Sequence, residues 1–354
     1  MAAGPETWRR LRRTLSDLLT TGAQAEERRI ATGLLVDRDA AELLLPAEIG
    51  DFTDFFASVH HATNVGRLFR PETPLLPNYK WVPVAYHGRS SSIGVSGTPV
   101  RRPRGQLKPP DADAPVFAPS RRLDYEAELG FFVGPGNRLG EPVPVGRAAR
   151  HLFGVALLND WSARDIQAWE YQPLGPFLAK SFASTLSPWV VTMDALAPFH
   201  TAAAERPPDD PRPLPYLMDE DDQVEGGLDV RVGVFIETAA MRARGDEPHL
   251  LSWSRFADTY WTPAQFVAHH TSNGCNLRPG DLLGSGTVSS REDGASGCMI
   301  ELTRGGASPL SLPGGETRSF LEDGDTIILR AAAEREGFVP IDFGECRARI
   351  EAAL

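Results

Sequence analysis

Cysteine is scarce in this chain of 354 residues, which has only Cys275, Cys298 and Cys346. The three lie far apart, and none belongs to a C-x-x-C pair. This spacing argues against a disulfide framework and against a structural zinc site. It favours a reducing compartment, so we expect the protein to be cytoplasmic.

Long apolar runs and an excess of positive charge are also missing. No segment approaches the roughly 20 consecutive apolar residues that a transmembrane helix needs. Lys and Arg number 36 against 47 Asp and Glu, so the formal net charge is −11. A negatively charged protein is a poor ligand for nucleic acid and for an anionic membrane surface. The sequence therefore predicts neither partner and leaves small molecules and metal ions as candidates.

The N-terminal part of the chain, residues 6–44, has a helical pattern. The apolar residues that recur at helical spacing there are Trp8, Leu11, Leu15, Leu18 and Leu19. Arginines occupy the other face, and no hydrophobic segment follows them, which argues against a secretory signal. The pattern therefore predicts an N-terminal helical segment, while the length of 354 residues allows one large domain or two smaller ones.

From about residue 80 the pattern changes to short apolar runs separated by Gly, Pro and Ser. The runs that we expect to be strands are residues 81–86, 92–97, 128–133, 189–192, 228–236, 299–303 and 326–330. Helical patterns are sparse and cover residues 161–170 and 263–270. Many short strands with turn signals between them predict a mixed α/β, β-rich fold of the sandwich or barrel kind, with few helices.

Glu126 and Glu128 are two residues apart in a stretch that is predicted to be a strand. Side chains two apart in a strand point to the same face, so these carboxylates repel each other unless a cation lies between them. A solvated strand face is the commoner explanation for such a pair in isolation. Asp160, at the end of an apolar run, and Asp54, between apolar residues, add two further acids. Four converging carboxylates would form a site for a hard cation.

A predicted helix follows Asp160 and places Arg164 and Gln167 on one face. Both would lie about one turn from Asp160, where they can donate hydrogen bonds to a bound substrate. A surface ion pair is the alternative for Arg164. Lys180 follows an apolar segment and lies either beside a buried anion or extended to solvent, and the second is commoner for a lysine considered alone.

His61 is a candidate general base, because histidine titrates near neutral pH. Asp54 precedes it by seven residues, about two turns if both belong to one helix, so the two side chains would share a face. The adjacent His60 is an equal candidate on these grounds. Glu301 lies inside a predicted apolar strand, where a carboxylate needs a partner and a histidine would supply one.

Several long, ordered motifs resemble the fumarylacetoacetase family closely. They are DFFASVHHATNVG (54–66), FFVGPGNRLGEP (131–142), NDWSARDIQ (159–167), YQPLGPFL (171–178) and NGCNLRPGDLL (273–283). The resemblance runs from about residue 45 to the C-terminus. These uncommon strings go beyond the E-x-E and the later Asp that the wider superfamily shares.

The resemblance implies a metal-dependent hydrolase of carbon–carbon bonds. Family members cleave 4-fumarylacetoacetate to fumarate and acetoacetate, which is the last step of tyrosine degradation through homogentisate. They fold as a mixed β-sandwich roll, work as homodimers and hold Ca²⁺ or Mg²⁺. A small SH3-like barrel usually precedes the catalytic domain. The resemblance implies that residues 1–45 are a remnant of the linker after that barrel, and that residues 46–354 are the catalytic domain.

By position, the family's functional residues fall on this sequence in three groups. The metal ligands fall on Asp54, Glu126, Glu128 and Asp160. The catalytic residues fall on His61, rather than His60, on Glu301, which orients it, and on Arg164, Gln167 and Lys180, which surround the reacting carbonyl. The substrate contacts fall on Phe56, Arg70, Gln167, Tyr171 and Thr287.

Phe56 departs from the family pattern, which has a substrate-contacting Tyr at this position. The missing hydroxyl removes one hydrogen bond, worth about 0.5–1.5 kcal/mol. Two alternatives therefore remain beside fumarylacetoacetate hydrolysis: a hydrolase of another acylpyruvate or 1,3-diketo acid, and a truncated, inactive relative. Retention of the whole catalytic set argues against the inactive relative, since an idle site has no need for buried charges.

Overall fold

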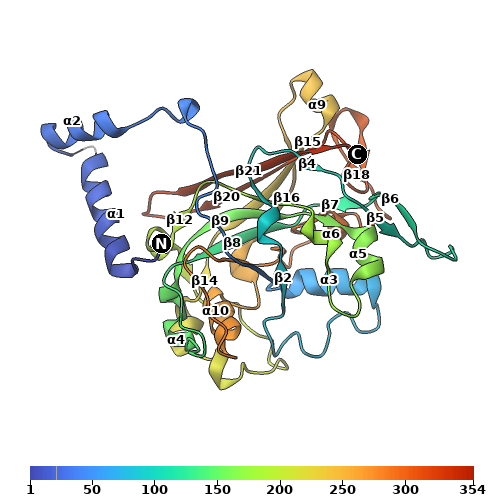
Figure 1. Cartoon of the computed structure of the whole chain (residues 1–354), viewed down its shortest axis with the longest axis horizontal. Coiled ribbons are helices and arrows are strands. Elements are labelled where there is room, and N and C mark those ends of the chain that lie inside the picture. Colours follow the sequence, from blue (N-terminus) through green and yellow to red (C-terminus); the bar gives the residue numbers. More distant parts are fainter. Residues whose placement is uncertain (21) are drawn as a thin grey trace.

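Two β-sheets packed face to face form the body of the molecule (Figure 1). The computed structural model describes residues 1–20 and 22–354, apart from the side chain of residue 27. The fold is mixed α/β and β-rich, as the sequence predicts. Most connections between the strands carry short helices, which lie around the sheets.

The larger sheet has eight strands, seven of them in the order β2-β1-β17-β8-β9-β11-β3, while β12 pairs with β9 beside this path. Their bounds are β1 Phe52–Phe55, β2 Ala85–Gly88, β3 Ile93–Val95, β8 Ala127–Val133, β9 Leu152–Asp160, β11 Ser184–Leu186, β12 Val191–Thr192 and β17 Leu282–Gly284. The central strands β8 and β9 are buried along almost their whole length. Burial on both faces explains why their sequences are mainly apolar instead of alternating, apart from Glu128 in β8 and Asn159 and Asp160 at the end of β9.

The smaller sheet has five strands in the order β16-β15-β20-β21-β4. Their bounds are β4 Val100–Arg101, β15 Arg231–Glu237, β16 His249–Arg255, β20 Thr326–Ala333 and β21 Ile341–Glu351. Near the end of β21 buried and exposed residues alternate, which is typical of a sheet with one face toward the core and one toward solvent.

The main hydrophobic core lies between the two sheets. Leu129 of β8 and Leu157 of β9 belong to the same buried cluster as Val232 of β15 and Leu329 of β20. Burying each such side chain contributes about 1.5–3 kcal/mol to folding. The strands of the larger sheet are therefore held firmly, and side chains at their ends occupy fixed positions.

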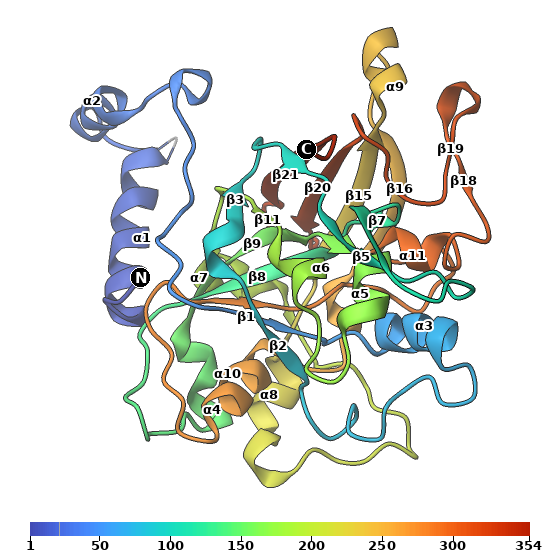
Figure 2. The ribbon, with the colours of Figure 1, turned by 45° about the vertical axis from the view of Figure 1, so that its right-hand side comes forward.

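Helices surround the sheets, and α3 and α5 lie next to each other on the same side (Figure 2). The bounds of the α-helices are α1 Pro5–Leu19, α2 Ala25–Leu34, α3 Val59–Phe69, α4 Val145–Ala148, α5 Arg164–Glu170, α6 Leu178–Ser181, α7 Met193–Leu196, α8 Glu220–Glu225, α9 Ala239–Arg244, α10 Pro263–Thr271 and α11 Met299–Leu302. The 3₁₀ helices are η1 Arg38–Ala40, η2 Ser90–Ser92, η3 Ala149–His151, η4 Ala197–Phe199, η5 Pro215–Leu217, η6 Phe256–Asp258 and η7 Pro313–Gly315.

The remaining strands form two-stranded ladders, β5 with β6, β7 with β10, β13 with β14 and β18 with β19. Their bounds are β5 Arg104–Leu107, β6 Val116–Pro119, β7 Leu123–Asp124, β10 Ser162–Ala163, β13 His200–Thr201, β14 Gly227–Leu228, β18 Leu310–Ser311 and β19 Thr317–Arg318. The β7–β10 ladder matters for the site, because it joins the segment before β8 to the segment after β9.

The N-terminal segment contains two separate helices, α1 and α2, where the sequence predicted one helical stretch. They project from one side of the sheets (Figure 1). Trp8 anchors α1, since its ring contacts Phe153 edge-on at 5.2 Å and its indole Nε1 donates to the Met1 carbonyl at 3.0 Å. Among the described residues, no helix combines the length and the apolar composition needed to cross a membrane.

Two expected strands differ from the structure. Residues 299–303, predicted as a strand, begin with the short helix α11. A short buried apolar run has the same composition in either conformation, so the periodicity does not separate them. Residues 81–84 lie outside any strand, and β2 begins only at Ala85.

Candidate active site

Three strands of the larger sheet bring four carboxylates together at one end of the sheet. Asp54 is in β1, Glu128 is in β8 with Glu126 immediately before it, and Asp160 is the last residue of β9. β17 lies between β1 and β8, and it carries Gly284 opposite Asp54. A Cβ at Gly284 would come within 2.3 Å of the Asp54 carboxylate, so the glycine leaves the room that this side chain occupies.

These four side chains form one compact, buried cluster. One carboxylate oxygen from each of Asp54, Glu126, Glu128 and Asp160 lies within 4.8 Å of the others. All four residues are at most 6% exposed. Buried carboxylates at this spacing repel one another strongly, and an arrangement of oxygen donors alone is typical of Ca²⁺ and Mg²⁺ sites.

Glu128 shows that the cluster is incomplete by itself. Within the described part of the chain neither of its carboxylate oxygens has a hydrogen-bond partner, although the residue is 0% exposed. A buried, unpaired carboxylate costs several kcal/mol unless it is protonated or coordinates a cation. The residues present therefore fit a hard divalent cation.

Two basic side chains neutralise part of the cluster. Lys180 Nζ donates to Glu126 Oε2 at 2.6 Å and to Asp160 Oδ2 at 2.9 Å. Arg164 Nη1 lies 2.7 Å from Glu126 Oε1, and its Nη2 pairs with Asp124 at 2.9 Å. Two cations against four carboxylates leave at least two negative charges, which one dication can balance. The sequence pattern alone favoured a solvent-exposed Lys180. In the structure Lys180 lies beside buried carboxylates, which is the other alternative that the sequence left open.

The pKa values of Asp54, Glu126 and Glu128 diverge because their partners differ. Burial, followed by the charge of Asp160, raises the pKa of Asp54 well above its ordinary value. Burial and then the charge of Asp54 do the same for Glu128. Burial opposes ionisation of Glu126 too, but the attraction of Lys180 and Arg164 outweighs it and lowers its pKa. A cation near Asp54 and Glu128 would supply the positive charge that Glu126 already receives from Lys180 and Arg164.

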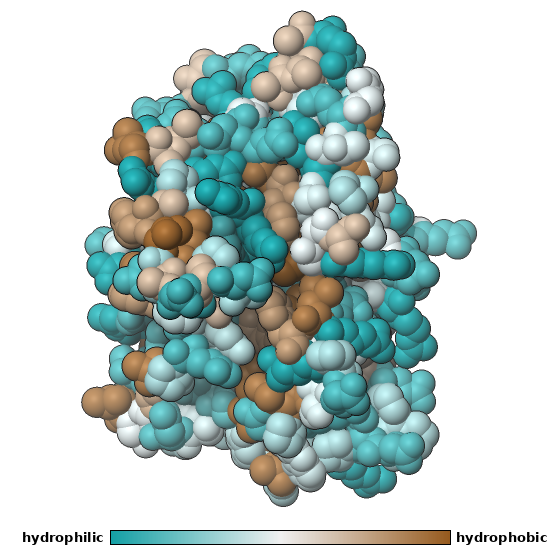
Figure 3. Space-filling view, turned by 90° about the vertical axis from the view of Figure 1, so that its right-hand side faces the viewer, coloured by the Kyte–Doolittle hydropathy of each residue, from teal (hydrophilic) through white to brown (hydrophobic). Residues whose placement is uncertain are grey.

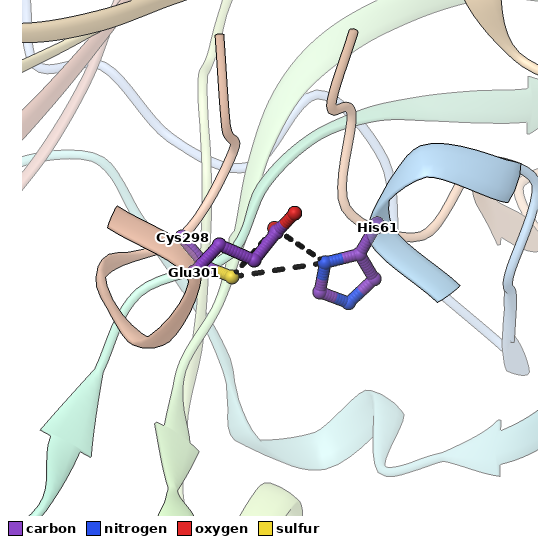
Figure 4. A group of neighbouring side chains, drawn as sticks. All are labelled: His61, Cys298 and Glu301. Carbon is purple, nitrogen blue, oxygen red and sulfur yellow. Dashed lines mark hydrogen bonds and ion pairs between the residues drawn. The ribbon is translucent and has the colours of Figure 1, made fainter. Parts of the chain in front are cut away.

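His61 and Glu301 form a buried pair beside this cluster (Figure 4). Glu301 Oε2 lies 2.6 Å from His61 Nδ1, and Glu301 Oε1 accepts from Asn64 Nδ2 at 2.9 Å. The charge of His61 lowers the pKa of Glu301 to about 2, although burial acts in the opposite direction. A carboxylate at Nδ1 holds the proton on that nitrogen and leaves Nε2 as an acceptor.

The local structure around this pair differs from the prediction in two respects. Asp54 and His61 do not share a helix, since Asp54 is in β1 and α3 begins only at Val59. Ser58 caps α3 by accepting from the His61 backbone N–H at 3.2 Å, which fixes where the helix starts. Glu301 lies in helix α11 and not in a strand.

A cavity of about 320 Å³ lies between α3, α5 and the edge of the larger sheet. Figure 3 views the molecule from the side on which α3 and α5 lie, and this face is hollowed near its middle with hydrophobic side chains in the hollow. Asp54, Glu126 and His61 line the cavity, as do Arg164, Gln167 and Lys180. The acidic cluster, the histidine and the donors thus face one space, while His60 lies in a separate surface groove.

Most of the residues implied as substrate contacts line the same cavity. Phe56, Arg70, Gln167 and Tyr171 all belong to its wall. The Phe56 ring contacts the His61 ring edge-on, with centroids 5.2 Å apart. Thr287 is not part of that wall, and its buried hydroxyl has no hydrogen-bond partner among the described residues.

The sequence matches the family described as "Fumarylacetoacetate (FAA) hydrolase C-terminal" over residues 51–351. It is 47% identical over 358 residues to the fumarylacetoacetase of Bos taurus, covering 100% of this chain and 83% of that protein. It is 50% identical over 355 residues to the fumarylacetoacetase of Caenorhabditis elegans, covering 99% and 82%. This chain belongs to the fumarylacetoacetase family.

Solved structures of more distant proteins share the fold of this fumarylacetoacetase family member. A putative HpcE protein from Mycobacterium smegmatis has a TM-score of 0.52 and 21% sequence identity, and the match covers 93% of this chain and 85% of that one. The structure of Cg1458 with inhibitor has a TM-score of 0.53 and 14% identity, with 88% and 80% covered. At such identities the likeness establishes the fold alone.

Sequence reasoning missed three polar side chains that touch the site of this fumarylacetoacetase family member. The Tyr86 hydroxyl donates to Asp160 Oδ2 at 2.5 Å, and the Ser184 hydroxyl donates to Asp160 Oδ1 at 2.8 Å. Cys298 donates its thiol to Glu301 Oε2 at 3.0 Å. Tyr86 and Ser184 lie in strands paired with β1 and β9, so only the strand register reveals them.

Proposed function

We propose that this protein hydrolyses the carbon–carbon bond of 4-fumarylacetoacetate to fumarate and acetoacetate, the last step of tyrosine degradation through homogentisate. The observation that carries the proposal is one cavity whose wall joins the four-carboxylate cluster to the His61–Glu301 pair. The curated relatives with 45–50% identity are named fumarylacetoacetase, and they match this chain over at least 99% of its length.

We assign the cation to Ca²⁺ or Mg²⁺, held by Asp54, Glu126, Glu128 and Asp160. The two unpartnered oxygens of Glu128 support this assignment. A bound dication would polarise the diketone oxygens and stabilise the enolate of the leaving acetoacetate. A set of four carboxylates with no other donor type suits Ca²⁺, which accepts about six to eight oxygen ligands, slightly better than Mg²⁺ with its stricter octahedral geometry.

His61 is the proposed general base. Glu301 accepts from Nδ1, which leaves Nε2 free to take a proton from a water molecule in the cavity. The resulting hydroxide attacks a carbonyl of the 1,3-diketone. Glu301 also stabilises the imidazolium that forms, because its lowered pKa keeps it ionised throughout the neutral range.

Arg164, Gln167 and Lys180 are the proposed donors to the oxyanion. All three line the cavity beside Glu126, and Arg164 Nη1 donates to Gln167 Oε1 at 3.2 Å, which fixes the two side chains relative to each other. A well-aimed donor of this type lowers the activation barrier by about 3–4 kcal/mol. The protonated His61, or Lys180, then returns a proton to the carbon of the departing fragment.

Substrate binding is assigned to Arg70, Tyr171 and Gln167, with Phe56 as an apolar contact. Thr287 does not line the cavity. Arg70 supplies the positive charge that a terminal carboxylate of the substrate requires. Its side chain lines the cavity, and its Nε has no partner within the described part of the chain, so it is available to a ligand.

We also propose a homodimer and a cytoplasmic location. The homodimer rests on the family, because its members form homodimers. Three widely spaced cysteines, free in the structure, are in keeping with a reducing compartment. Light scattering coupled to size-exclusion chromatography would measure the mass against 38.5 kDa for one chain, and a single species of that mass would contradict the dimer.

The test is a spectrophotometric assay of fumarylacetoacetate disappearance with the purified protein. We expect rapid turnover that EDTA abolishes and that added Ca²⁺ or Mg²⁺ restores. His61→Ala should remove turnover and leave cation binding intact, while His60→Ala serves as the matched control. Unchanged turnover in His61→Ala would contradict the assigned base.

A second candidate substrate is another acylpyruvate or 1,3-diketo acid, and Phe56 favours it. This side chain lines the cavity and offers no hydroxyl to a polar group of the substrate. Parallel assays with acylpyruvates would show a higher kcat/KM than fumarylacetoacetate if this candidate is correct. Absence of turnover with every diketo acid, in a folded protein that binds the cation, would indicate an inactive relative.

A further inference from the structure

A second cluster of ligand atoms lies behind the proposed base, and its chemistry differs from that of the four carboxylates. His61, Cys298 and Glu301 place an imidazole nitrogen, a thiol sulfur and a carboxylate oxygen within 4.8 Å of one another (Figure 4). Cys298 is 0% exposed, and the side chains of the other two are at most 3% exposed. The proposed mechanism uses His61 and Glu301 but gives no role to the thiol.

We propose that His61, Cys298 and Glu301 form an inhibitory site for a thiophilic divalent cation such as Zn²⁺ or Cd²⁺. Sulfur and imidazole nitrogen are donors that these ions prefer, whereas Ca²⁺ and Mg²⁺ take oxygen donors. The two clusters therefore select different ions, although they lie beside the same cavity. The binding part of this proposal stands by itself, and only the inhibition rests on the proposed function.

The distances within the cluster are close to those of a tetrahedral site. Cys298 Sγ lies 3.7 Å from His61 Nδ1 and 3.0 Å from Glu301 Oε2, and Nδ1 and Oε2 are 2.6 Å apart. Bond lengths of about 2.0 Å to nitrogen and oxygen and about 2.3 Å to sulfur place neighbouring donors about 3.3–3.6 Å apart. The His61–Glu301 contact must open by about 0.7 Å and the Cys298–Glu301 contact by about 0.5 Å to reach these separations. The hydroxyl of Ser289, 2.9 Å from Oε2, or a water can take the fourth position.

Charge balance also favours the exchange of protons for a cation. The thiol of Cys298 now donates to Glu301 Oε2, and His61 Nδ1–H donates to the same oxygen. On binding, the thiol proton leaves to solvent and the imidazole proton moves from Nδ1 to Nε2. The thiolate and the carboxylate then carry two negative charges, which equal the charge of the dication, beside a neutral imidazole.

An ion can approach this cluster from either side. His61 lines the cavity of about 320 Å³, while Glu301 lines a separate groove that also includes Asn64 and His60. The His61 side chain thus lies between the cluster and the cavity, and the Glu301 side chain lies between the cluster and the groove.

The consequence for the enzyme follows from the tautomer of His61. With the ion on Nδ1, the ring nitrogen that faces the cavity carries a proton and donates hydrogen bonds. It no longer accepts a proton from water, so the base is lost. Inhibition of this kind does not require displacement of the ion held by the four carboxylates, and excess Ca²⁺ should not relieve it.

The binding experiment uses the protein saturated with Ca²⁺ and titrated with Cd²⁺, with the ultraviolet absorption of the cadmium–thiolate bond as the readout. Cys275, which is only partly buried, offers the matched control. We expect the absorption to persist in Cys275→Ser and to vanish in Cys298→Ser. Loss of the thiolate should weaken binding by more than about 100-fold, since even a residue that only orients a ligand is worth 10–100-fold.

The activity experiment measures inhibition by Zn²⁺ and Cd²⁺ as a fraction of each variant's own rate without these ions, at several Ca²⁺ concentrations. Inhibition should be independent of Ca²⁺ in Cys275→Ser and absent in Cys298→Ser. Cadmium–thiolate absorption that survives in Cys298→Ser, or disappears in Cys275→Ser, would overturn the site. Cys298→Ala replaces the serine variant if that does not fold. If no diketo acid is turned over, the absorption titration still decides the question of binding.

Discussion

The two buried clusters beside the cavity differ in how far the protein completes them. Around Glu301 every charged atom has a partner, since Asn64 donates to Oε1 while His61, Ser289 and Cys298 contact Oε2. In the acidic cluster both oxygens of Glu128 lack any partner in the described part of the chain. The first cluster is fixed by the chain's own donors, and the second is built for a ligand that the chain does not supply.

The opposite pKa shifts of two glutamates with buried side chains express this difference. Burial raises the pKa of Glu128, and the charges of Asp54 and Asp160 raise it further. The same burial acts on Glu301, yet the charge of His61 and its hydrogen bonds lower the pKa to about 2. Partners therefore decide whether a buried carboxylate stabilises the fold or costs free energy.

The largest expected effect follows from Glu128→Gln. We expect cation affinity and turnover to fall by at least about 100-fold, because the variant lacks one anionic ligand. Without the cation, the variant should unfold with a free energy about 1 kcal/mol higher than the wild type, since a buried unpaired carboxylate is gone. Calcium titration and urea unfolding in EDTA measure the two quantities, and the exposed Glu336→Gln is the control. A cation-free variant less stable than the wild type would contradict the claim that the unpaired Glu128 carboxylate destabilises the cation-free protein.

Glu301→Gln should behave in the opposite way toward stability. It removes the partner of a buried histidine, and we expect the free energy of unfolding to fall by about 2 kcal/mol and kcat to fall 10–100-fold with little change in KM. Urea unfolding and steady-state kinetics at neutral pH check both. An unchanged kcat would show that Glu301 does not position the base.

The pH dependence of the stability difference between wild type and Glu301→Gln tests the lowered pKa of Glu301. The pKa of Glu301 is about 2 in the folded protein and 4.5 in its ordinary state, so the unfolded chain binds more protons between these values. The stabilisation is therefore fully present above about pH 4.5 and is lost as the pH falls toward about 2. The difference between wild type and Glu301→Gln should shrink over this window. A difference that stays constant down to pH 3 would contradict the assigned pKa.

The smallest expected effect is a gain of turnover in Phe56→Tyr. The new hydroxyl would face the cavity and supply one hydrogen bond to fumarylacetoacetate, worth about 0.5–1.5 kcal/mol, or roughly two- to tenfold in kcat/KM. Phe131→Tyr, whose side chain is fully buried in the core and does not line the cavity, provides a control in which only stability should fall. No gain, or a loss, in Phe56→Tyr would mean that the pocket is organised around a different substrate.

The strands and the acids could be predicted from local patterns, but several partners could not. The strand pattern predicted β8, and the spacing of Glu126 and Glu128 placed both carboxylates on one side. The apolar run that forms β9 was not predicted as a strand. The roles of Tyr86 and Ser184 depend on which strands become neighbours, and no local pattern carries that information. Their contact with Asp160 was therefore not predicted.

Local patterns were enough to identify the β-rich class, the family and the acidic residues, because strand periodicity and long motifs are properties of short stretches of a chain. The tertiary structure alone decided that Glu301 lies in a helix, that Lys180 is buried between Glu126 and Asp160, and that Cys298 touches the His61–Glu301 pair. Lys180 and Glu126 are 54 residues apart, and Cys298 and His61 are 237 residues apart, so no local pattern carries these contacts. They follow from the packing of the two sheets, which brings strand ends and helix starts together at one buried place.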